Sequence, residues 1–139
     1  MKTWTLMYLL IWVAFLQMAL ALFPALGLGV NLDLHFVVGL CVVALAWHVS
    51  LRVRRTACPD RIKRITRATA YLSVFAGILG IILYLNYRSV LSLPFQEVVV
   101  FVHFGTAVAI ITQASASAAA FDMWEEKEFV TPTDSKVSP

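Results

Sequence analysis

Four long apolar stretches separated by short polar connections dominate the chain. They cover about residues 4–22, 34–51, 68–85 and 95–118. Each is close to the roughly 20 residues that an α-helix needs to cross ~30 Å of hydrocarbon. Backbone amides in lipid must find hydrogen bonds within their own segment, so we expect helices. The pattern predicts an all-α, integral membrane four-helix bundle, with residues 1–124 as the membrane domain.

The charged residues are few and unevenly distributed. Only 14% of the 139 residues are charged and 60% are hydrophobic, whereas a soluble domain carries about 25% charged residues. The net charge of +3 does not indicate nucleic-acid binding, because the basic residues gather in one connection, residues 52–67. They are Arg52, Arg54, Arg55, Arg61, Lys63, Arg64 and Arg67. The positive-inside rule places this connection and both the N- and C-termini in the cytoplasm, on the inner side of the plasma membrane.

The two ends of the chain need separate interpretation. Lys2, the first apolar run and Ala19-Leu20-Ala21 also resemble a secretory signal. However, the run is longer than the usual apolar core of about 7–15 residues, so we expect a retained helix. Residues 125–139 are acidic and then rich in Pro, Ser and Thr without periodicity, which predicts a disordered cytoplasmic tail.

Two histidines lie within apolar segments, near the ends that we expect outside. His35 falls just inside the second segment, and His103 lies about eight residues into the fourth. An imidazole at membrane depth is costly unless something binds it. The axial offset of roughly 5–10 Å between them is small enough for helix tilt to close. We therefore expect these two rings to be able to share one haem iron as axial ligands.

Small residues accompany each histidine on its helix face. On a helical wheel Gly39 lies on the face of His35 and Ala107 on that of His103, while Gly77 belongs to a stripe of small residues on the third segment. A flat macrocycle fits against such faces, and membrane helices also pack through small residues. The small faces are therefore compatible with a cofactor site but do not require one.

The remaining polar positions have simpler interpretations. His48 lies thirteen residues after His35, which rotates it roughly 220° around the helix. We expect it to be a packing or interfacial residue; a second site near a quinone head group is the alternative. Gln17 and Gln113 are mid-segment amides, which predicts interhelical hydrogen bonds. Asp33 and Glu97 stand at helix starts, where the helix dipole favours acids.

These features together resemble the membrane-embedded four-helix cytochromes b, which include respiratory membrane-anchor subunits. The resemblance covers roughly residues 30–118. It is carried by the basic connection and by short motifs, namely His35-x3-Gly39 with a second histidine at 48, Phe75-Ala-Gly-Ile-Leu-Gly80, and Val102-His-Phe. It implies that His35 and His103 are the axial ligands of one outer haem b, with Gly39, Ala107 and Gly77 beside it.

The chain departs from the family pattern at the inner end. Such families often hold two haems, with two ligand histidines on each of two helices. Here the fourth segment has Ala116 and Ser117 where an inner ligand is expected, and the spacing from His35 to His48 is one residue short of fourteen. The resemblance therefore implies at most one bis-histidine haem.

The leading hypothesis is a small membrane b-type cytochrome or haem-bearing anchor subunit. It relays electrons between the quinone pool and a partner protein, and it forms a homodimer or part of a larger complex in the lipid bilayer. We identify no catalytic residues of its own. The alternatives are a haem-free structural or assembly subunit and, less favoured, a small transporter, because no ionisable acid or base lies near the middle of a segment to bind a substrate.

Overall fold

The structure, a computed structural model, describes residues 2–22 and 32–130, with side chains as far as residue 127. Within these ranges every regular element is a helix: α1 (Thr3–Leu22), α2 (Leu32–Arg54), α3 (Asp60–Tyr87) and α4 (Gln96–Val130). All four helices are long and apolar enough to cross a membrane. The all-α class and the four membrane-length helices are thus confirmed.

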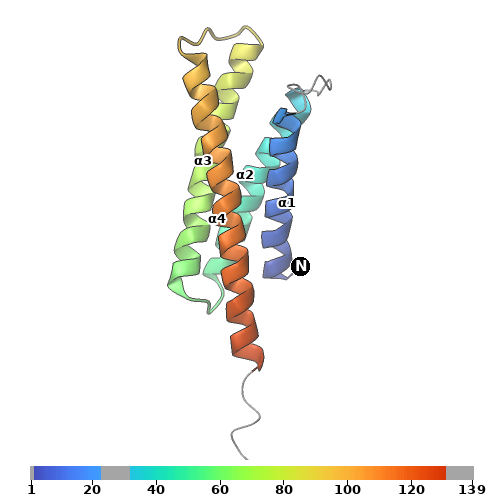
Figure 1. Cartoon of the computed structure of the whole chain (residues 1–139), viewed down its shortest axis with the longest axis vertical. Helices are drawn as coiled ribbons and strands as arrows, with labels where there is room; N and C mark the ends of the chain where they lie inside the picture. Colours follow the sequence, from blue (N-terminus) through green and yellow to red (C-terminus); the bar gives the residue numbers. More distant parts are fainter. Residues whose placement is uncertain (1, 23–31, 131–139) are drawn as a thin grey trace, which may run out of the picture.

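The four helices form an up-down-up-down bundle (Figure 1). Each helix packs against its neighbours in sequence, and α1 also packs against α4. In the described part of the chain no close backbone contact joins α1 to α3 or α2 to α4, so these pairs lie across the diagonals. We call the end with residues 52–67 the arginine end, and the end where α3 turns into α4 the histidine end.

The buried core is concentrated towards the arginine end. Met7 of α1, Val49 and Val53 of α2 and Ile62 of α3 are almost fully buried there. The hydroxyls of Thr66, Thr69, Ser73 and Ser117 are also buried, and each donates to a backbone carbonyl of its own helix. Such bonds satisfy a polar side chain without another partner, so this half of the bundle is closely packed and internally satisfied.

Polar and aromatic contacts set the depth of the helices at the histidine end. The Tyr84 hydroxyl donates to Asp33 at 2.5 Å, and the Tyr84 ring stacks on Phe36 with centroids 4.6 Å apart. Between α3 and α4, Asn86 donates to the Gln96 side chain at 2.9 Å. These contacts tie the start of α2 and the start of α4 to the end of α3. They therefore constrain the positions of His35 and His103 along the bundle axis.

The helices extend beyond the apolar stretches at the arginine end. α2 continues to Arg54 and α3 already begins at Asp60, so much of the arginine-rich connection is helical. α4 continues through residues 125–130, which the sequence pattern assigned to a disordered tail; residues 131–139 lie outside the described residues. Arg, Lys and Glu are good helix formers, so loss of apolar character does not end a helix.

We predict that the arginine-end core contributes measurably to stability. Replacing Met7, which is 2% exposed, with Ala should lower the free energy of unfolding by about 2 kcal/mol. That value is at the low end of the usual 2–5 kcal/mol for such a truncation, because lipid is as apolar as the core and mainly packing is lost. Met123→Ala is the matched control, since Met123 is 61% exposed. Denaturant titration in detergent micelles measures both, and equal losses would contradict the assignment of Met7 to the core.

Candidate functional site

The histidine half of the bundle contains a large, partly open cavity. Its volume is about 780 Å³, and side chains from all four helices line it. The lining residues closest to the histidines along the helices are Gln17, His35, Gly39, Gly77, Gly80 and His103. Ligand and cofactor pockets usually measure about 300–1,000 Å³. The cavity is therefore large enough for a sizeable organic group.

The two intramembrane histidines meet inside this cavity, although they lie on diagonally opposed helices. The ring centroids of His35 on α2 and His103 on α4 are 6.4 Å apart, and the ring planes are inclined at 69°. The difference in depth between the two histidines that was estimated from the sequence therefore does not keep the rings apart, because the packing of the helices brings them together. The two imidazoles reach towards each other across the bundle from α2 and α4.

Unpaired polar atoms gather at the same place. In the described residues three buried side-chain nitrogen or oxygen atoms have no hydrogen-bond partner: Nδ1 of His35, Nδ1 of His103 and Oε1 of Gln17. All three residues line the cavity. A buried polar atom without a partner costs about 1–3 kcal/mol. These three atoms are the part of the cavity lining where a bound group could form hydrogen bonds.

Gln17 of α1 lies against the first of these rings. Its amide nitrogen Nε2 is 3.2 Å from Nε2 of His35, and because an amide nitrogen only donates, the ring nitrogen is the acceptor of this bond. A Cβ atom at Gly39, one turn further along α2, would lie 2.9 Å from the same amide nitrogen. Real Cβ atoms do not approach that closely, so the absence of a side chain at Gly39 makes room for the amide. The sequence assigned Gly39 to a macrocycle, whereas here its nearest contact is Gln17.

Two glycines of α3 form the opposite wall. A Cβ at Gly80 would lie 3.3 Å from Cε1 of His103, and a Cβ at Gly77 would lie 3.2 Å from the Val43 side chain of α2. Both distances are tighter than ordinary van der Waals contact. The absence of a side chain at Gly80 allows the His103 ring to come close to the α3 backbone.

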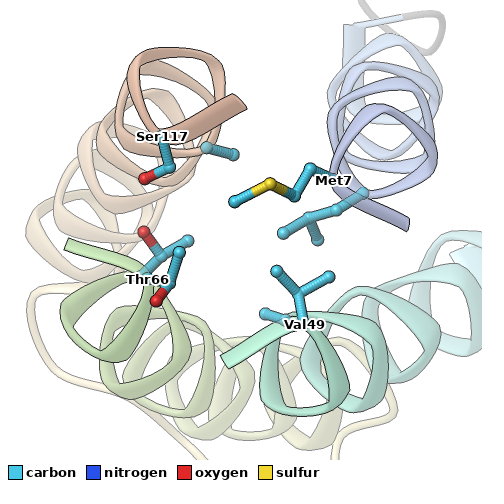
Figure 2. Close-up of a pocket in the computed structure, with 8 residues that line it drawn as sticks. Met7, Val49, Thr66 and Ser117 are labelled. Atoms are coloured by element: carbon cyan, nitrogen blue, oxygen red, sulfur yellow. The ribbon is translucent and has the colours of Figure 1, made fainter. Parts of the chain in front are cut away.

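In the described part of the chain, the void found in the arginine half is far smaller. A second void, of about 10 Å³, lies among the buried hydroxyls and apolar side chains there. Figure 2 shows Met7, Val49, Thr66 and Ser117 converging on it, one from each helix. A void of that size holds at most about one water molecule. The bundle is thus hollow at one end and filled at the other.

The residues predicted from sequence are placed as follows. His35, His103, Gly39, Ala107 and Gly77 all line the cavity. His48 is exposed on the outside of α2 and does not line it. Sequence reasoning did not include Gln17 and Gly80 among the site residues. The only signal for Gln17 was its depth, since it stands five residues before the end of α1, close to the level of His35.

The pair of imidazoles is not part of a larger cluster of protein ligands. In the part of the chain that the structure describes, no three His, Cys, Asp or Glu side chains come together in a metal-binding group. Structural zinc needs about four protein ligands. Two opposed imidazoles are instead enough for a metal that brings its own equatorial ligands, as haem iron does.

Comparison with protein family models, curated proteins and solved structures finds no match for this chain.

We predict that filling the cavity stabilises the ligand-free chain. Ala107→Leu should raise its free energy of unfolding by about 1 kcal/mol, because roughly 24 cal/mol is recovered per Å³ of void filled. Ala118 of the same helix is 2% exposed in the filled half, so Ala118→Leu should cost about 1–3 kcal/mol by overpacking. Unfolding of both variants in micelles measures the difference. Destabilisation of similar size by both would argue against an open cavity.

Proposed function

We propose that the protein is a small membrane b-type cytochrome that binds one haem b between His35 and His103. The observation that carries the proposal is the apposition of the two imidazoles within a large cavity, with an unpaired nitrogen on each ring. Its role is to relay single electrons between the quinone pool and a partner protein.

The separation of the rings supports a shared metal. Two metal–nitrogen bonds of about 2.0–2.1 Å, plus roughly 1 Å from each nitrogen to its ring centre, put the centroids of two opposed imidazole ligands about 6 Å apart. The centroids of His35 and His103 are 6.4 Å apart. No helix movement is needed for the rings to reach that spacing. A macrocycle between them would lie beside Gly77, Gly80 and Ala107, which line the same cavity.

The filled arginine half supports a single haem. The void there is about 10 Å³, and His48, the remaining histidine of the chain, is exposed rather than directed into the bundle core. A second site inside this half would require the core around Met7 and Val49 to open. A single haem near one face cannot by itself carry electrons across a bilayer. Exchange with quinol in the membrane and with a partner on the histidine side is the arrangement that we propose.

The residues of the chain determine the environment of the redox centre. When bound, haem supplies a one-electron ferric/ferrous couple, whose potential depends on axial ligands, hydrogen bonds and burial. His35 and His103 would hold the iron, and the small residues of α3 and α4 would allow the group to approach the helices closely. Leu83, Val100 and Ile110 give the cavity an apolar lining. Because such surroundings disfavour net charge, we expect them to raise the reduction potential relative to a solvated bis-imidazole haem.

The visible spectrum tests this proposal. The purified full-length protein should show the sharp reduced-minus-oxidised α-band of low-spin haem b, at about one haem per chain. His35→Ala and His103→Ala should each lower haem content more than tenfold, because one axial bond is lost. His48→Ala is the matched control and should keep the full band. A wild-type protein that takes up no haem on reconstitution, or variants at 35 and 103 that retain the band, would overturn the proposal.

We further propose that the arginine end faces the cytoplasm and the histidine end the outside of the plasma membrane. The support is the accumulation of arginines at one end, where Arg52, Arg54, Arg55, Arg61, Arg64 and Arg67 are exposed, together with the positive-inside rule. The histidine end carries only Arg88 among the described residues. This orientation places the haem site on the outer side.

Thiol labelling of intact cells measures the orientation. The native Cys41 and Cys58 are first replaced with Ala, and single cysteines are introduced at Val90 and at Ala57, both of which are exposed. An impermeant maleimide should label Val90→Cys in intact cells, and Ala57→Cys only after permeabilisation. The reverse pattern would place the arginine end outside.

A further inference from the structure

We infer that the outer face shared by α2 and α3 at the arginine end binds an anionic phospholipid. Four exposed residues define this face, which we call the basic face: Trp47 and Arg54 of α2, and Arg67 and Tyr71 of α3. The lipid phosphate lies near the two guanidinium groups, and the acyl chains run along the two aromatic rings. The inference goes beyond the proposed function and does not depend on haem, because the cavity lies in the other half of the bundle.

An aromatic pair marks the level of the membrane interface on this face. The rings of Trp47 and Tyr71 meet edge to face across the two helices, with centroids 6.0 Å apart and planes inclined at 72°. Their exposed fractions are 44% and 59%, so the pair covers the outside of the bundle rather than its core. Trp and Tyr are enriched where acyl chains meet head groups. The phosphates of the same leaflet are therefore expected slightly further towards the arginine end.

The two arginines stand where such phosphates lie. Arg54 follows Trp47 by seven residues and Arg67 precedes Tyr71 by four, which keeps each arginine within about 40° of its ring around the helix. Because α2 and α3 run in opposite directions (Figure 1), residue 51 of α2 is level with Arg67, and Arg54 is roughly 5 Å further along the axis. Long guanidinium side chains at this spacing can reach one phosphate, which they bind with paired hydrogen bonds.

The basic face is turned away from the acidic side of the bundle. On α3, Thr69 contacts Gln113 of α4, and Thr69 lies about 160° around the helix from Tyr71. In the described residues α4 makes no close backbone contact with α2. Apart from Asp60, the described acids at the arginine end all belong to α4, namely Asp122, Glu125 and Glu126. The charge at this end is thus divided between two sides of the bundle.

The positive charge of the basic face is not neutralised by the chain itself. Asp60, the one acid of the arginine-rich connection, pairs with Lys63, with 3.6 Å between Nζ and Oδ1. Within the described residues neither Arg54 nor Arg67 forms an ion pair. Basic residues beside a membrane helix attract anionic lipids. Charge complementarity together with the aromatic pair therefore favours a negatively charged phospholipid over a zwitterionic one.

Quenching of Trp47 by brominated lipids tests the inference at the site itself. With Trp4, Trp12 and Trp124 replaced by Phe, Trp47 is the only tryptophan of the chain. Its fluorescence falls when a brominated acyl chain lies beside it. The protein is reconstituted in mixed vesicles in which either phosphatidylglycerol or phosphatidylcholine is brominated. We expect phosphatidylglycerol to be favoured roughly tenfold, because each basic residue near the surface is worth up to about fivefold.

Trp4 provides a control at the same depth. Gln17 of α1 meets His35 of α2, and these helices are antiparallel, so Trp4 is level with residue 48, next to Trp47. Trp4 is 37% exposed and belongs to α1, which lies diagonally across from α3. A chain that keeps only Trp4 should show less than about twofold preference. Equal preference at Trp4 and Trp47 would show that anionic lipid gathers around the whole arginine end, and would overturn the inference.

Two double variants with the same loss of charge separate the site from general attraction. Arg54→Gln with Arg67→Gln should reduce the preference at Trp47 to less than about twofold. Arg55→Gln with Arg61→Gln should retain it, because both residues are exposed but lie about 80° away from Trp47 and Tyr71 around their helices. An equal reduction in the two double variants would contradict a site on the basic face.

Thermal unfolding in neutral detergent micelles provides a second measurement with all four tryptophans retained. Added phosphatidylglycerol should raise the Tm of the full-length protein more than added phosphatidylcholine does, since a ligand that binds the folded state stabilises it. The variant lacking Arg54 and Arg67 should lose most of this difference, and the variant lacking Arg55 and Arg61 should keep it. The same rise in all three proteins would overturn the inference.

Discussion

The structure depends on one constraint, which is that three polar side chains must be accommodated at one depth of an apolar bundle. Two imidazoles and an amide meet at the level of His35, and each retains a buried atom without a partner. Unsatisfied groups in a medium of low polarity are costly. The chain accommodates them by placing glycine at the helix positions that face them, so that the rings and the amide fit close to the backbone.

The two halves of the bundle differ in how they are packed. The arginine half is filled by apolar side chains and by hydroxyls that bond to their own helices, so it can keep four helices in register. The histidine half holds about 780 Å³ of space and is fixed mainly at its rim, by Tyr84 with Asp33 and by Asn86 with Gln96. The bundle thus combines a closely packed base with a preformed cavity.

Much of the fold could be predicted because a lipid bilayer allows few backbone structures. The length of each apolar stretch matches the thickness of the hydrocarbon layer, and backbone hydrogen bonding in lipid then requires helices. The ends of the helices could not be predicted as well. Apolar patterning ends near residue 51 and near residue 118, whereas α2 and α4 continue, because a helix needs hydrogen bonds and propensity rather than hydrophobicity.

For the site, the sequence by itself determined which residues were costly and at what depth they stood: His35 and His103, with small residues on their faces. Only the tertiary structure decided that these rings meet across the diagonal of the bundle, that Gln17 is the neighbour of His35, and that Gly39 makes room for an amide. The physical reason is that a helical wheel gives the face of a residue on its own helix. Which face of a neighbouring helix lies opposite that residue depends on how all four helices pack together, and the sequence of a single segment does not specify this packing.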